Sequence, residues 1–349
     1  MAASFLTQWR LKFRDFRSDL VLERGRFKIA AIILALYLLL VTAIGIYWSW
    51  VPQSFSVTTN AALKLNSQQQ SVTGAVTTAT IIEVAESLLD KPGGLISNDI
   101  SPPGIWLDNI PSWEYGVLIQ LRDMSKAMRE SFSRSQSQSL EDTDLAKAES
   151  RFNFNSESWA MPSSESEYRD GILFLDRYLD RLVSNQSVDA QFYARADNLN
   201  YWLRTVETRL GNLSQRLSAS VGQRRLNTDL AGESDALQAT PAPGEMLVKT
   251  PWTEIDNVFY EARGAAWALS HFLQAVEVDF AAVLQKKNAR VSLSQIIREL
   301  EASQQSVYSP MILNGSGFGV LANHSLVMAS YISRANAAII DLRSLLDQG

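Results

Sequence analysis

The sequence predicts an all-α protein, in which an N-terminal transmembrane helix precedes a multi-helix bundle with long heptad-like seams and ordered irregular loops. Residues 29–51 form an uncharged and mostly apolar run. As a helix rising about 1.5 Å per residue, this run spans roughly 34 Å, slightly more than the hydrocarbon core of a bilayer. Beyond it, several long segments repeat apolar residues at alternating steps of four and three, and no stretch shows sustained strand alternation.

The apolar run is interpreted as an uncleaved anchor rather than a signal peptide. It is longer than the roughly 7–15 residues of a signal core, and it ends in aromatic residues that suit a membrane interface. Residues 1–28 contain seven Lys or Arg and three acids, whereas Lys64 is the first charge beyond the run. The positive-inside rule therefore predicts a cytoplasmic N-terminus and places residues 52–349 outside the cytoplasm. The basic segment also has amphipathic spacing, so it either lies on the membrane surface or is simply a charged flank.

Composition excludes some functions. The net charge is −5, and because residues 1–28 contribute +4, the remainder has a charge of −9. A net-acidic domain is a poor candidate for nucleic-acid binding, where phosphate neutralisation supplies much of the affinity. The absence of cysteine fits a domain outside the cytoplasm that does not depend on disulfides.

The chain divides into a cytoplasmic basic segment (1–28), the anchor (29–51), a stalk (52–75) and a helical domain (76–349). The stalk is inferred from a polar composition rich in Ser, Thr, Gln and Asn. Apolar periodicity within the domain predicts helices near 76–89, 115–133, 145, 168–182, 192–217, 255–283, 293–300 and 328–346.

The three longest seams lie in segments 192–217, 255–283 and 328–346. Small residues at 262 and 264–266 would allow another helix to approach closely. Several long seams in one chain can pack against each other, although one of them could instead serve a second copy in a homodimer.

Four segments interrupt the helical pattern. Segments 91–114, 151–163 and 309–325 contain too many large apolar residues to stay solvated, so we expect ordered loops. Segment 223–250 has few large apolar residues and contains the run ATPAPGE, which predicts a flexible excursion. This excursion either joins two helices of one bundle or separates two subdomains.

The loops and one helix face supply the candidate partner-binding residues. Binding residues concentrate on loops held by rigid scaffolds, and Trp, Tyr and Arg are enriched at interface hot spots. The stripe on segment 255–283 is equally well explained as the solvated flank of the seam. The candidates are Asn98, Asp99, Trp106, Asp108, Trp113 and Glu114 in the first loop, Asp256, Tyr260, Arg263 and Trp267 on the helix, and Asn314 and His324 in the last loop.

No motif predicts a cofactor or a metal. The chain has two histidines, His271 and His324, without an H-E-x-x-H or an EF-hand pattern. The glycine-rich run at 315–319 lacks the Lys-Ser/Thr of a P-loop, so a tight loop is the favoured interpretation. Asp99, Asp108 and Glu114 could form an acid–base pair, but acidic residues in such loops more often cap turns and helix starts.

The stretches LDKPGGLISNDISPPG, FYEARGAAWAL and SPMILNGSGFG resemble the uncharacterised proteobacterial inner-membrane proteins grouped as domain of unknown function 2333. This resemblance implies a Gram-negative envelope location, with the anchor in the bacterial inner membrane and the main domain in the periplasm. It supplies no activity or catalytic residue. The leading hypothesis is a non-enzymatic, membrane-anchored interaction or scaffold module in the cell envelope that binds a protein partner. The alternative is an envelope hydrolase or transferase that uses the loop carboxylates.

Overall fold

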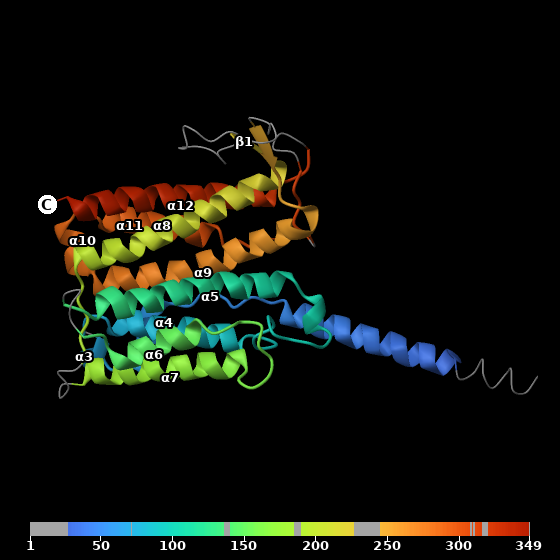
Figure 1. Ribbon diagram of the computed structural model, residues 1–349, viewed down its shortest axis with the longest axis horizontal. Coiled ribbons are helices and arrows are strands. Elements are labelled where there is room, and N and C mark those ends of the chain that lie inside the picture. The colour runs from blue at the N-terminus through green and yellow to red at the C-terminus, as the bar shows by residue number, and fades with distance from the viewer. Residues whose placement is uncertain are drawn as a thin grey trace, which may run out of the picture.

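The computed structural model describes residues 27–70, 72–135, 140–184, 190–226, 245–307, 309, 311–315 and 320–348. Figure 1 shows long helices lying side by side along one axis, with an apolar helix, Phe27–Trp48, projecting from one end of the bundle. The predicted all-α bundle is thus confirmed. The basic segment predicted to be amphipathic lies almost entirely outside the described residues.

The bundle is built from long helices joined by short ones. The helices are α2 (Val57–Lys64), α3 (Ser67–Gln70), α4 (Ala75–Asp90), α5 (Asn109–Ala127), α6 (Thr143–Phe152), α7 (Ser164–Val183), α8 (Ala196–Ser218), α9 (Ile255–Asp279), α10 (Ala281–Lys286), α11 (Arg290–Ala302) and α12 (His324–Asp347). Shorter turns are η1 (Gly104–Trp106), a π-helical turn η2 (Met128–Phe132), η3 (Ala219–Val221) and η4 (Trp252–Glu254). The strands β1 (Gln223–Leu226) and β2 (Glu245–Val248) form an antiparallel pair.

Helices α5 and α9 pack against each other at the centre of the bundle, between a group of α8, α11 and α12 and a group of α4, α6 and α7 (Figure 1). The seams of α8 and α12 face each other within one chain, and both are buried along their length. Intramolecular packing therefore accounts for these two seams, and homodimerisation stays a prediction.

Helices α5 and α9 approach almost backbone to backbone. A Cβ atom placed on Gly264 would lie 2.1 Å from the carbonyl oxygen of Trp113, and one placed on Gly116 would lie 2.1 Å from that of Glu261. Two glycines, one from each helix, therefore make this contact possible. The close approach expected from the small residues of segment 255–283 is confirmed.

Segment 52–75 is not the stalk that its polar composition suggested. Val57 and Ala61 of α2 pack with Val76 of α4 and Ala275 of α9 in a small apolar cluster. One apolar residue in four is enough to give a short helix one buried face, so α2 packs against the bundle although its segment is mostly polar. The chain therefore enters the bundle directly after the apolar helix.

The ends of segment 223–250 pair as β1 and β2, with Gln223 opposite Val248. Residues 227–244, which form most of the predicted excursion, lie outside the described residues. The excursion connects α8 to α9, two helices that contact each other in the same bundle.

We predict that replacing Gly264 with Ala lowers the unfolding free energy by about 3 kcal/mol or more, because the added methyl group must push α5 away from α9. Gly211 of α8 provides a matched control, since a Cβ there would lie at an ordinary 3.6 Å from the side-chain nitrogen of Asn336. Gly211→Ala should raise stability by up to about 1 kcal/mol, because alanine favours helix. Unfolding of the full-length variants followed by circular dichroism measures both changes. Equal effects at the two positions would contradict the close contact.

Candidate functional site

The irregular segments predicted at 91–114 and 309–325 meet at the end of the bundle from which the apolar helix projects (Figure 1). Asp108 from the first segment and Ile312 and Asn314 from the last line one cavity of about 320 Å³. Asp256, in the first turn of α9, lines the same cavity. We call this space the acidic cavity. It brings together three of the residues that the sequence offered as candidates.

The acidic cavity places the carboxylates of Asp108 and Asp256 close enough for the charge of one to act on the other. Burial raises the pKa of Asp256, and the negative charge of Asp108 raises it further. Trp252 and Met311 at the rim are largely exposed. The cavity thus combines a carboxyl group of raised pKa with accessible apolar surface.

A second cavity, of about 230 Å³, lies between α9, the end of α11 and the start of α12. Arg263 lines it, and we call it the Arg263 cavity. The guanidinium donates from Nη1 to the Gln305 carbonyl oxygen at 2.9 Å and from Nη2 to that of Gln304 at 2.8 Å. Its other walls are mostly apolar and come from Phe259, Val307, Val327, Met328 and Tyr331.

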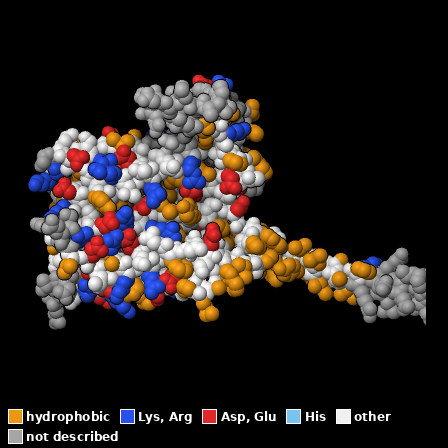
Figure 2. Space-filling view, viewed as in Figure 1, with side chains coloured by type: hydrophobic (Ala, Val, Ile, Leu, Met, Phe, Trp, Pro, Cys, Tyr) orange, Lys and Arg blue, Asp and Glu red, His pale blue; other side chains and the backbone are white. Residues whose placement is uncertain are grey.

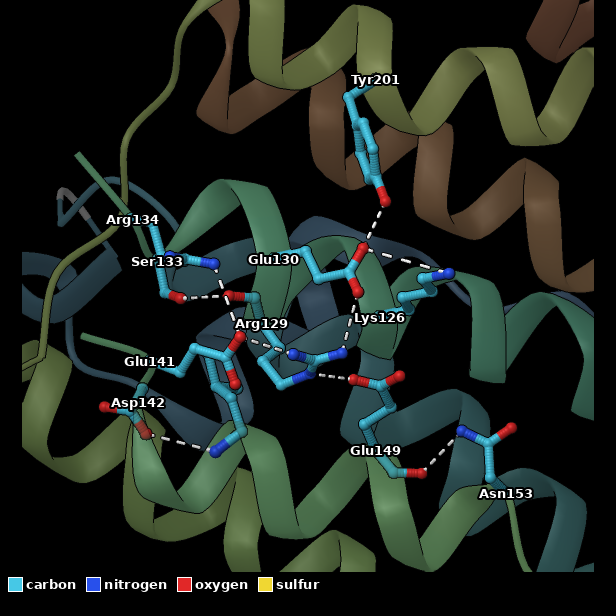
Figure 3. Close-up of polar contacts among 11 residues, drawn as sticks. Lys126, Arg129, Glu130, Ser133, Arg134, Glu141, Asp142, Glu149, Asn153 and Tyr201 are labelled. Atoms are coloured by element: carbon cyan, nitrogen blue, oxygen red, sulfur yellow. Dashed lines mark hydrogen bonds and ion pairs between the residues drawn. The ribbon is translucent and has the colours of Figure 1, made fainter. Parts of the chain in front are cut away.

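Arg263 differs in its partners from the ion-paired arginines of the bundle, of which Arg129 is an example. Arg129, in η2, forms ion pairs with Glu130, Glu141 and Glu149, and a hydrogen bond to Glu149 is the main cause of its raised pKa (Figure 3). Within the described residues, no carboxylate pairs with Arg263, whose guanidinium donates to backbone carbonyls, and burial lowers its pKa. The Arg129 cluster is therefore electrostatically complete, whereas Arg263 places a partly buried and uncompensated charge beside a cavity.

His324 also lines the Arg263 cavity, at the first position of α12. The ring Nδ1 of His324 accepts a hydrogen bond from the Leu313 backbone N–H at 2.9 Å. The backbone N–H of His324 donates to the Leu313 carbonyl oxygen, also at 2.9 Å. With Nδ1 occupied as an acceptor, the other ring nitrogen bears the proton in the neutral form.

Glu114 and Asn98 hold the first loop together rather than facing a cavity. The buried Glu114 carboxylate accepts hydrogen bonds from the Ile96 and Ser97 N–H groups, at 2.8 Å each, and pairs with the buried Lys91 ammonium. The Asn98 amide donates to the Ser158 carbonyl and to Glu165 at 2.9 Å. Both residues therefore appear in structural roles, fastening segment 91–108 to α5 and to the α6–α7 loop.

Asp99 is half-buried beside Gly104 of η1 and does not line either cavity. Burial raises its pKa, and the nearby Glu114 and Glu165 raise it further. The three loop carboxylates offered as catalytic candidates are thus divided among different surroundings.

Residues 21–349 match a family model described as an uncharacterized protein conserved in bacteria, DUF2333. The chain belongs to this family. A search of curated proteins found no match, and neither did a search of solved structures. The resemblance noted in the sequence is confirmed.

Two of the candidate tryptophans belong to the core of this DUF2333 protein. Trp113 and Trp267 are almost fully buried, and their ring centroids lie 5.3 Å apart where α5 crosses α9. Tyr260 is half-buried and packs against the same core. Trp106, in contrast, is 58% exposed in η1. An aromatic side chain at a helix edge can face either the core or the solvent, and the sequence did not distinguish these cases.

A buried histidine connects the segment after the apolar helix to α9. The Phe55 N–H donates to His271 Nε2 at 3.1 Å, so His271 Nδ1–H donates to the Trp267 carbonyl at 2.7 Å. The Phe55 ring stacks on the imidazole with centroids 4.1 Å apart. Burial lowers the pKa of His271 to about 4. Among the described residues no His, Asp or Glu cluster could hold a metal, and His271 is a packed histidine.

We predict that His271 makes stability depend on pH in a specific direction. Its folded pKa of about 4 lies below the unfolded value of 6.5, so the unfolded chain binds the proton first as pH falls. The contribution is therefore complete above about pH 6.5 and declines toward pH 4, by on the order of 3 kcal/mol.

The measurement compares wild type with His271→Gln, whose amide oxygen can still accept from Phe55. The stability difference between the two should shrink as pH falls from 7 to 4. Titration of other groups is common to both proteins and cancels in this difference. A difference that stays constant with pH would show that His271 does not remain neutral in the folded state.

Proposed function

We propose that this DUF2333 protein is a single-pass inner-membrane protein with a cytoplasmic N-terminus and a periplasmic helical domain. In this proposal the domain binds another envelope protein through the Arg263 cavity, as a non-enzymatic interaction module. The membrane and partner parts rest on separate observations.

The membrane part is supported by the contacts of the apolar helix with the domain. A Cβ on Gly45 would lie 3.3 Å from the Cβ of Pro103, and the Trp48 ring packs at Gly93. A cleaved signal sequence would have no reason to fit the mature domain closely, whereas an anchor that remains would. The excess of Lys and Arg in residues 1–28 supports the orientation.

The partner part rests on Arg263. Its guanidinium has a charge that no described carboxylate neutralises, and the surrounding walls are apolar. A volume of about 230 Å³ is below the roughly 300–1,000 Å³ of typical small-molecule pockets and suits one or two side chains. The cavity therefore favours a protein segment that presents an apolar side chain next to a carboxylate, the arrangement of an interface hot spot.

The acidic cavity favours a second candidate function, an envelope hydrolase or transferase. Asp256, with its raised pKa, could serve as a general acid, and the Asp108 carboxyl group lines the same cavity as its partner. Asp108→Asn and Asp256→Asn would abolish turnover without affecting partner capture if this candidate is correct.

We predict that two different changes in the Arg263 cavity remove the same partner. Arg263→Met removes the positive charge. Val327→Trp fills the cavity from an exposed position, and the valine side chain that it replaces makes no hydrogen bond. Loss of a hot-spot contact costs at least about 2 kcal/mol, or roughly 30-fold in affinity. Copurification of tagged full-length protein from native membranes, quantified by mass spectrometry, measures the loss.

Arg298→Met is the matched control, because Arg298 is an exposed arginine of α11 that does not line the cavity. It should retain all partners, and all three variants should melt within a few degrees of wild type. Retention of every partner by both cavity variants would exclude the Arg263 cavity as the binding site.

A further inference from the structure

The end of the bundle next to the apolar helix exposes an unusual set of side chains. Each tryptophan that is largely exposed in the described residues lies at this end. These are Trp50 after the apolar helix, Trp106 in η1, Trp159 in the α6–α7 loop and Trp252 in η4, with 58–81% of each side chain exposed. Tryptophan is enriched where a protein surface meets the boundary between lipid and water.

Aliphatic residues accompany these tryptophans. Ile105 precedes Trp106 in η1 and is 58% exposed, and Met161 and Leu321 are exposed in two other loops of the same end. Figure 2 shows hydrophobic side chains covering the projecting helix and the region where it joins the bundle, whereas charged side chains of both signs are mixed over the body. The apolar surface is thus continuous with the helix that would cross the membrane.

Geometry sets the depth of η1 relative to the bilayer. Lys28 marks the cytoplasmic boundary of the apolar helix, and the twenty residues from Ile29 to Trp48 cover about 30 Å, the thickness of the hydrocarbon core. Pro103 and Leu107, on either side of η1, approach this helix at Gly45. Gly45 lies three residues, or about 5 Å, below the level of Trp48. Tilting the helix would place Gly45 deeper still.

We propose that this end of the bundle, centred on Ile105 and Trp106, is inserted into the outer interface of the same bilayer that the anchor crosses. The domain therefore lies directly on the membrane rather than standing away from it. This inference rests on the proposed membrane anchoring and adds a lipid-binding surface to it. A lipid bilayer fits this surface because the exposed tryptophans come from four separate segments around the anchor. In addition, η1 lies beside Gly45 of the anchor, which leaves no space for a protein between this end of the bundle and the bilayer.

The test uses the natural absence of cysteine. Full-length Ile105→Cys protein is labelled with a polarity-sensitive fluorophore and reconstituted into vesicles of phosphatidylethanolamine and phosphatidylglycerol. Nitroxide groups are attached to the lipid chains either near the headgroup or near the bilayer centre. Val291→Cys on α11, 79% exposed at the opposite end of the bundle, is the matched control. Leu38→Cys, in the apolar helix, reports on the anchor itself.

We expect the Ile105→Cys label to emit at shorter wavelength than the Val291→Cys label and to be quenched several-fold more by the shallow nitroxide. The Leu38→Cys label should be quenched best by the deep nitroxide. If the Leu38→Cys label is quenched but the Ile105→Cys label behaves like the control, the inserted end is wrong and the anchor stands. If the Leu38→Cys label is not quenched, the proposed anchoring fails as well. If the Ile105→Cys variant has a lower melting temperature than wild type, a label at Trp106→Cys is used in its place.

Discussion

The contact of α5 with α9 through Gly116 and Gly264 is the constraint on which the arrangement of this DUF2333 protein depends. Backbone contact brings the rings of Trp113 and Trp267 together at the centre of the bundle. Trp267 then packs against Phe55, whose N–H is held by His271 one turn further along α9. The chain that leaves the apolar helix is thereby fixed to the central helix pair within a few residues.

This connection has consequences for function. A flexible stalk would let a domain sample many distances from a membrane, whereas a buried connection sets one distance and one orientation. The loops before α5, α7, α9 and α12 are gathered at the end nearest the apolar helix (Figure 1). Both cavities lie in the same half of the molecule, along the first turns of α9. In the function proposed here, a partner therefore has to bind close to the membrane surface.

Periodicity predicted the helices, because burying one face of a helix imposes spacing that can be counted along the chain. The α8 and α12 seams and the small residues of α9 were predicted for this reason. The irregular segments 91–114 and 309–325 were predicted as ordered loops. Their convergence and the direction in which individual loop residues point were not predicted, because both depend on partners distant in sequence. Glu114 is held by Lys91, and Arg263 has no acidic partner in the described residues, yet both are simply charged residues beside an apolar stripe in the sequence.

The central claim is that the apolar helix and the bundle form one rigid unit, and a disulfide formed in native membranes tests it most directly. Gly45→Cys with Pro103→Cys places two Cβ atoms about 3.3 Å apart in a chain that has no other cysteine. Ala43→Cys with Pro103→Cys is the control, because positions 43 and 45 lie about 200° apart around a helix. Rapid formation of an intramolecular disulfide, seen as a reducible change in gel mobility, is expected for the first pair only. Equal cross-linking of both pairs, or disulfides only between chains, would contradict a fixed position of the apolar helix against the bundle.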